Sequence, residues 1–143
     1  MNSDTIKLLR ECNAGIKMGE DAIKQVLPHT SNERLRAALE SGKDAHAMLG
    51  DETHAMLLSN NAATADAHPI ARYMSAIKIC GTMMMKESDS KIADLMTDGC
   101  DMGIKSLNKY LNKYKRASSQ SRDLAKRIIA SEEELKHSIS AFL

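Results

Sequence analysis

Two pairs of side chains have the types and the spacing that bind divalent metal ions. Asp51 is followed three residues later by His54, and Glu134 is followed three residues later by His137. Residues three positions apart on a helix are surface neighbours, so each pair can offer a carboxylate oxygen and an imidazole nitrogen to one ion. Such ligands suit iron or manganese. Whether these pairs can bind a metal ion depends on the helices on which they lie and on the direction in which each side chain projects.

The composition is typical of one ordinary soluble domain. The chain has 143 residues, with 20 Lys+Arg against 19 Asp+Glu, and 43% of its residues are hydrophobic. This length predicts a single domain over residues 1–143. A net charge of +1, with one Phe, three Tyr and no Trp, argues against partners such as nucleic acid or an acidic membrane. Without a signal-peptide pattern or an apolar run of about 20 residues, we expect a cytoplasmic protein.

The cysteines do not form a recognisable site. Cys12, Cys80 and Cys100 are odd in number and contain no Cys-x-x-Cys pair, which argues against a disulfide scaffold and a thiolate zinc site. Each lies among apolar residues at helical spacing. We expect them to be buried, reduced and inert, with redox sensing as the alternative.

Helical periodicity predicts an all-α protein with four main helices, because no alternating run of β-branched residues competes with it. The first helix begins after Ser3 or Asp4 and stops before Pro28. Thr30 and Glu33 have the spacing of a capping box for the second helix. The inward stripe of that helix is then predicted to contain Leu35, Ala38, Gly42, Ala45, Leu49 and Met56.

The second half of the chain contains a long helical stretch that must break. From Pro69 to Arg116 one helix would be roughly 70 Å long, so we expect a new start near residues 86–90, capped by Ser88, Asp89 or Ser90. A shorter helix then precedes this start. Ser118-Ser119 caps the last helix, whose inner stripe is predicted to be Leu124, Ile128, Leu135, Ile139 and Phe142.

Connection lengths predict the topology. Short links join the first two helices and the last two, so each pair forms an antiparallel hairpin, and residues 60–89 between the hairpins are long enough to return along the bundle. A short repeat favours two related halves, because Cys12-x-x-Gly15-Ile16-Lys17 recurs as Cys100-x-x-Gly103-Ile104-Lys105. The predicted fold is therefore a four-helix bundle with one long crossover.

These motifs carry a resemblance to a known group of proteins. The set of Cys12-x-x-Gly15-Ile16-x-Met18-Gly19, the crossover with Pro69, and Ile92-Ala93-Asp94-Leu95-Met96-x-Asp98-Gly99 resembles uncharacterised bacterial ferritin-like four-helix-bundle proteins. The likeness spans nearly the whole chain, but its motifs are helix-packing patterns. It implies a ferritin-like bundle within a superfamily whose active members, such as rubrerythrins and bacterioferritins, hold two iron or manganese ions.

The ligands of such a di-metal site are one Glu from each of two helices and a Glu-x-x-His from each of the other two, all directed inward. At about 100° per residue, the Asp51 and Glu134 pairs project away from the stripes through Leu49 and Leu135, and we interpret them as solvated. The inward or flanking candidates form only a partial metal site, consisting of Glu20, His46, Glu52 and Glu132. The alternative for these residues is hydrogen bonding or pairing with Lys17, Arg34 or Arg127 at the margin of the bundle.

The helix after residue 90 offers no inward carboxylate to a metal. Asp94, Asp98 and Asp101 fall on the face opposite Met96 and Cys100. A cationic row also lies on the outer face of this helix, and we interpret it as solvated, with an anionic partner as the alternative. Its members are Lys105, Lys109, Lys113, Lys115 and Arg116.

The crossover offers a surface for self-association. Its apolar stripe must cover either the bundle or a second subunit, so a homodimer through this helix is expected; the stripe consists of Ile70, Met74, Ile77 and Met84. The consecutive methionines at 83–85 are interpreted as core filling rather than as a soft-metal site.

The sequence thus predicts a non-enzymatic ferritin-like bundle that acts through protein–protein interaction or self-association. No catalytic motif is found, and no cofactor is expected. The alternative is a divergent di-metal protein with oxidase or metal-storage activity, in which Glu20, His46, Glu52 and Glu132 bind Fe or Mn.

Overall fold

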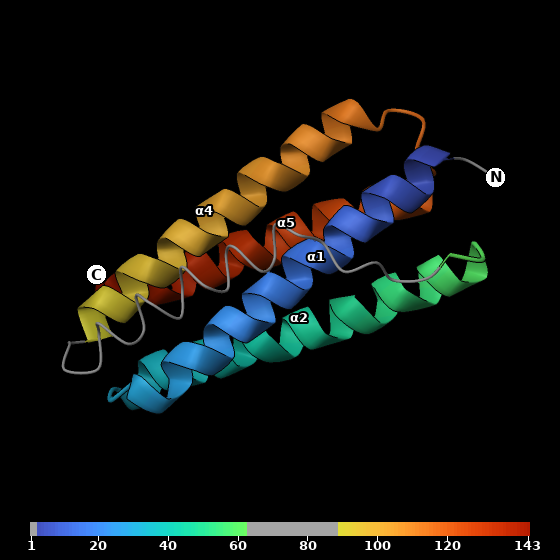
Figure 1. The fold of residues 1–143 in the computed structure, drawn as a ribbon. Helices are drawn as coiled ribbons and strands as arrows, with labels where there is room; N and C mark the ends of the chain where they lie inside the picture. The colour runs from blue at the N-terminus through green and yellow to red at the C-terminus, as the bar shows by residue number, and fades with distance from the viewer. Residues whose placement is uncertain (1–2, 63–88) are drawn as a thin grey trace.

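The structure, a computed structural model, describes residues 3–62 and 89–143. These residues form four long helices and no strand, which confirms the all-α prediction for this part of the chain (Figure 1). The helices are α1 (Ser3–Val26), α2 (Glu33–Ser59), α4 (Asp89–Lys113) and α5 (Ser119–Ile139), with 3₁₀ turns at Leu27–His29 and Ser140–Phe142. The predicted crossover helix, with Cys80 and the stripe of Ile70, Met74, Ile77 and Met84, lies outside the described residues.

The four helices pack as two antiparallel hairpins. The helix α1 packs against α2, and α4 packs against α5, as their short links predict (Figure 1). The hairpins meet where α2 contacts α5 and where α1 contacts α4. Ala62, after α2, joins the core cluster that contains Leu8, whereas Asp89 contacts the loop at the opposite end of α1. The first described segment therefore ends, and the second begins, at opposite ends of the bundle.

Most helix boundaries agree with the sequence. The helix α1 ends at Val26, two residues before Pro28. Asp89 is the first described residue of α4, so the new start predicted near residues 86–90 stays a prediction. Ser118 caps α5, because its hydroxyl oxygen accepts a hydrogen bond from the backbone N–H of Ser121 at 3.2 Å. Such caps satisfy donors that have no partner within the helix.

The capping box predicted for α2 is wrong. The cap is Asn32, whose side-chain oxygen accepts from the backbone N–H groups of Arg34 and Leu35 at 2.8 and 3.1 Å. The hydroxyl of Thr30 instead donates to the carbonyl of Val26 at 2.9 Å. Because the chain leaves α1 through a 3₁₀ turn, Thr30 still lies within reach of the last turn of α1 and precedes the start of α2.

The loop of each hairpin is hydrogen-bonded to the first helix of the other hairpin. The carboxylate of Asp89, at the start of α4, accepts from the backbone N–H groups of Ser31 and Asn32 at 2.8 and 3.0 Å. At the other end, the hydroxyl oxygen of Thr5 in α1 accepts from the backbone N–H of Ser118 at 2.8 Å. These contacts hold the two hairpins in one register along the bundle.

The buried face of α2 is rotated slightly from the predicted stripe. Leu35, Gly42 and Leu49 are buried as predicted, but Ala38, Ala45 and Met56 are only half-buried. Their places toward the core are taken by Leu39, His46, Thr53 and Leu57. The larger leucines bury more apolar surface than the alanines beside them, which favours this rotation. The stripe of α5 is confirmed from Leu124 to Ile139, and Phe142 is partly buried.

The apolar core consists of two clusters, one toward each end of the bundle. The first contains Leu8, Leu9, Cys12, Ile16, Leu49, Leu57, Ala62, Leu107, Leu111, Ala117, Leu124, Ala125 and Ile128. The second contains Ala22, Ile23, Val26, Leu35, Leu39, Ile92, Met96, Cys100, Leu135 and Ile139. Burial of these side chains drives the helices together. The buried polar residues His46 and Glu132 lie between the two clusters.

Candidate functional site

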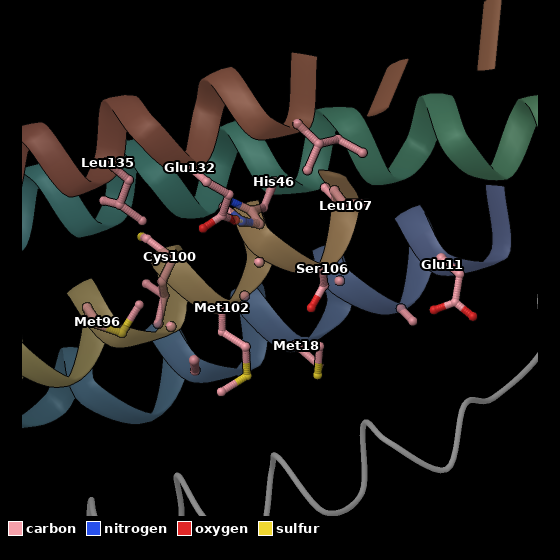
Figure 2. Close-up of a pocket in the computed structure, with 18 of the residues that line it drawn as sticks. Glu11, Met18, His46, Met96, Cys100, Met102, Ser106, Leu107, Glu132 and Leu135 are labelled. Carbon is pink, nitrogen blue, oxygen red and sulfur yellow. Dashed lines mark hydrogen bonds and ion pairs between the residues drawn. The ribbon is translucent and has the colours of Figure 1, made fainter. Parts of the chain in front are cut away.

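A buried histidine and a buried glutamate meet between the two core clusters. His46 of α2 is 1% exposed and Glu132 of α5 is 7% exposed. Their side chains point toward one another (Figure 2), and Nε2 of His46 is hydrogen-bonded to Oε1 of Glu132. Nδ1 of His46 lies 2.7 Å from the carbonyl oxygen of Gly42. Among the described residues, no buried side-chain nitrogen or oxygen is left without a partner.

The hydrogen bonds determine how this pair is protonated. A carbonyl oxygen can only accept, so Nδ1 of His46 carries a proton and donates it to Gly42. Burial by itself lowers the pKa of His46, but the hydrogen bond and charge of Glu132, the Gly42 carbonyl and the charge of Glu20 outweigh it and raise this pKa above 6.5. The contact with Glu132 therefore favours the protonated form of His46.

The two described cysteines are free, buried thiols. Burial, followed by the charge of Glu11, raises the pKa of Cys12 to about 12. Burial, together with the charge of Glu132 and a hydrogen bond to it, also raises the pKa of Cys100. Because the thiolate is the reactive form, both thiols are inert near neutral pH, as the sequence predicts.

Two of the glycines inside helices allow close contacts at this level of the bundle. A Cβ atom on Gly19 of α1 would lie 2.6 Å from Nε2 of His46, and one on Gly42 would lie 2.9 Å from Leu135. Any larger residue at Gly19 would displace the imidazole. On α4, by contrast, a Cβ on Gly103 would meet Glu132 no closer than 3.6 Å, which is ordinary contact.

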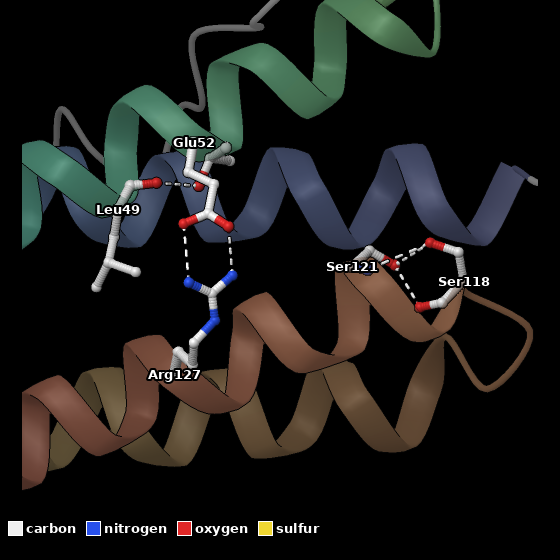
Figure 3. Close-up of polar contacts among 6 residues, drawn as sticks. Leu49, Glu52, Ser118, Ser121 and Arg127 are labelled. Atoms are coloured by element: carbon white, nitrogen blue, oxygen red, sulfur yellow. Dashed lines mark hydrogen bonds and ion pairs between the residues drawn. The ribbon is translucent and has the colours of Figure 1, made fainter.

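The structure brings together two of the four residues of the predicted metal site. His46 and Glu132 are in contact, but Glu52 forms a two-pronged ion pair with Arg127 across α2 and α5 (Figure 3). This hydrogen bonding with Arg127 lowers the pKa of Glu52. Glu20 lies 3.8 Å from the ammonium of Lys24, one turn along α1. Glu52 thus follows the pairing alternative that the sequence left open.

The pairs that have metal-ligand spacing in the sequence face solvent. Asp51 and His54 on α2 are exposed, and so are Glu134 and His137 on α5, as their angular positions predict. In the ranges that the structure describes, no three His, Cys, Asp or Glu side chains lie close enough to hold a metal ion. His46 and Glu132 are two donors, whereas a stable site for iron or manganese needs more.

A cleft of about 180 Å³ opens between α1 and α4 beside the His46–Glu132 pair (Figure 2). Its lining is mostly apolar and contains several glycines and flexible methionines. The lining includes Ala14, Gly15, Met18, Gly19, Met96, Cys100, Met102, Gly103 and Tyr110, with His46 and Glu132 at its inner surface. The sequence gives one signal for this cleft, the repeated Cys-x-x-Gly-Ile-Lys, which places Gly15 and Gly103 on its two walls.

Comparison with protein-family models, with curated proteins and with solved structures finds no match to this chain. Among the described helices, none is long and apolar enough to cross a membrane. The interpretation of the site therefore rests on its own geometry.

Proposed function

We propose that this chain is a non-enzymatic, ferritin-like four-helix bundle that acts by associating with another protein chain or with a second copy of itself. The observation that carries the proposal is the central polar layer. A di-metal bundle places a carboxylate from each of four helices at this level. Here α2 and α5 supply His46 and Glu132, which are hydrogen-bonded to one another, whereas α1 and α4 place Gly19 and Gly103 against them, together with the thiol of Cys100.

The arrangement of the hairpins supports the ferritin-like assignment. In such bundles two antiparallel hairpins are joined by one long crossover that returns along the bundle. The described residues form two hairpins, with Ala62 and Asp89 at opposite ends. The recurrence of Cys-x-x-Gly-Ile-Lys at residues 12–17 and 100–105 lies at the first helix of each hairpin. The net charge of +1 continues to favour a protein partner over nucleic acid.

The outer face of α2 supports association with a protein surface. Met48 is 67% exposed and Leu58 is 58% exposed, and Ala47 and Ala55 are exposed beside them. Covering these side chains with a partner would remove apolar surface from water, which favours association. We propose that a second copy of the chain covers this face. The homodimer predicted through Met74 is a separate proposal, and Met74→Glu tests it.

Sedimentation velocity tests the α2 interface. We expect the wild-type protein to sediment at twice the chain mass, and the double variant Met48→Glu, Leu58→Glu to sediment as a monomer with unchanged helicity by circular dichroism. The matched control is Leu143→Glu, which places the same charge on a side chain that is 59% exposed at the C-terminal end. A wild-type protein that is monomeric at every concentration would contradict self-association, and a dimeric double variant would exclude this face.

The second candidate is a divergent di-metal protein with oxidase or metal-storage activity. The contact of His46 with Glu132 favours it, because these two ligand types meet at one level of the bundle. Elemental analysis of protein from cells supplied with iron and manganese decides between the candidates. Two metal equivalents per chain, lost in the double variant Glu20→Gln, Glu132→Gln, would establish a metal centre. Protein with no metal above the level of the variant supports the first proposal.

A further inference from the structure

The cleft between α1 and α4 is lined by two glycines that the packing of the described residues does not require. No atom of the described residues lies within 4 Å of a Cβ built on Gly15, and the nearest contact at Gly103 is 3.6 Å. Alanine would fit at both positions. Glycine inside a helix is also less stable than alanine by about 1 kcal/mol. Packing among the described residues therefore explains Gly19 and Gly42, whereas Gly15 and Gly103, which widen the cleft, meet no close contact there.

Glu132 is the hydrogen-bond acceptor at the inner surface of the cleft, whose lining also contains the polar residues Glu11, Ser106 and Tyr110. The side chain of Glu132 is 10% exposed, and its Oε2 lies 3.7 Å from the Cβ position of Gly103 on the cleft wall. A carboxylate has about four lone-pair sites. The imidazolium of His46 and the thiol of Cys100 use two of them, so the carboxylate retains capacity for another donor.

The charges and the walls of the cleft define the rest of the ligand. His46 and Glu132 share one proton in their hydrogen bond and together carry no net charge, so a charge buried beside them would have no counter-ion and would be costly. Met18, Met96 and Met102 line the walls with flexible side chains that adapt to an apolar surface. The volume of about 180 Å³ is slightly larger than the roughly 150 Å³ of a protein cavity that accepts benzene.

We propose that this cleft binds a small neutral molecule, with an apolar body about the size of one aromatic ring and one hydroxyl or amino group that donates to Glu132. The site goes beyond the proposed association function, because its ligand is not a protein. The apolar body would lie among the methionines, beside Gly15 and Gly103. Neither Met48 nor Leu58 lines this cleft, so the two functions involve different faces.

Phenol and toluene test the proposal, because they have similar shapes and only phenol carries a donor. Both are titrated into protein labelled at the methionine methyl groups and followed by NMR. We expect phenol to shift the signals of Met18, Met96 and Met102 in a saturable manner, and to leave Met48 unchanged as the internal reference. Toluene should bind about tenfold more weakly, because it covers the carboxylate without offering it a hydrogen bond. Equal binding of the two probes, or no shift with phenol, would overturn the proposal.

A variant that fills the cleft provides the second test. Gly15→Leu should abolish the phenol shifts, whereas Ala130→Leu, which adds the same side chain at an exposed position of α5, should retain them. Phenol shifts that persist in Gly15→Leu would place the binding elsewhere. If Gly15→Leu lowers the melting temperature far more than Ala130→Leu, other residues of the same chain already fill the cleft, which also overturns the proposal. Sedimentation of Gly15→Leu reports separately on association, so either function can fail alone.

Discussion

His46 is the residue whose charge links the fold to pH. Its imidazolium is held between the Glu132 carboxylate and the Gly42 carbonyl, and these partners together raise its pKa above the ordinary 6.5. A raised pKa in the folded state means that folding favours the bound proton. The stabilisation is complete below about pH 6.5 and is lost as the pH rises through the folded-state pKa.

We therefore predict that the free energy of unfolding falls as the pH rises from 6.5 into the alkaline range. Denaturant titrations at a series of pH values measure it. The matched control is His46→Gln, whose amide has a similar reach but does not titrate, so its stability should vary less over the same range. A variant with the same pH profile as the wild type would show that another group is responsible.

Gly19 and Gly103 face the same polar layer but should respond in opposite ways to alanine. At Gly19 the added Cβ would lie 2.6 Å from the imidazole of His46, so we expect Gly19→Ala to destabilise the protein by about 1–3 kcal/mol. At Gly103 the added Cβ meets Glu132 at ordinary contact distance, so Gly103→Ala should stabilise by about 0.5–1 kcal/mol through helix propensity. Urea denaturation of both variants measures the difference, and equal effects would contradict the packing at His46.

At the scale of the helices, the start of α2 depends on Asn32. Its side chain accepts two backbone hydrogen bonds that would otherwise lack a protein partner. We expect Asn32→Ala to lower the free energy of unfolding by about 1 kcal/mol. Glu33→Ala is the control, because a capping box would need this side chain whereas the observed cap does not. A larger loss of stability for Glu33→Ala than for Asn32→Ala in thermal denaturation would instead indicate a capping box.

Periodicity predicted the helices well because their apolar stripes are strong. The helix α5 has an inner row from Leu124 to Ile139 and a serine at its start, and both features are local in sequence. The stripe of α2 was harder to place, because the polar His46 and Thr53 occupy buried positions in it. A buried stripe predicted from hydrophobicity alone is therefore displaced from the observed one toward the neighbouring alanines.

The candidate site was predictable only in part. Glu132 and His46 were identified because they interrupt apolar stripes, but their contact joins residues that are 86 positions apart. Glu52 lies at the edge of the inward face, where a small rotation of α2 decides between the core and Arg127. The cleft was not predicted, because the repeated Cys-x-x-Gly-Ile-Lys marks the glycines on its walls but not the distance between the two helices that leaves the space open.

At the scale of the whole molecule, the two hairpins are joined through contacts at both ends and a polar layer in the middle. The α1–α2 and α4–α5 loops lie at opposite ends of the bundle (Figure 1). Thr5 is hydrogen-bonded to the α4–α5 loop, and Asp89 is hydrogen-bonded to the α1–α2 loop. The His46–Glu132 pair lies between the two apolar clusters of the described residues. The bundle should unfold as one cooperative unit, because every helix contributes to both clusters or to the layer between them.

Removing the hydrogen bonds that Thr5 and Asp89 make to the two loops tests this cooperativity. Thr5→Val leaves the backbone N–H of Ser118 without its acceptor, and Asp89→Ala does the same for Ser31 and Asn32, so each change should cost about 1 kcal/mol. Sites this far apart share no partner, and the double variant should lose the sum of the two effects to within about 0.5 kcal/mol, still in a single transition. Circular dichroism and the fluorescence of the tyrosines, followed through the same urea titration, measure this. Two separate transitions would instead mean that the hairpins are independent units, and that the polar layer holds them together less firmly than their loops do.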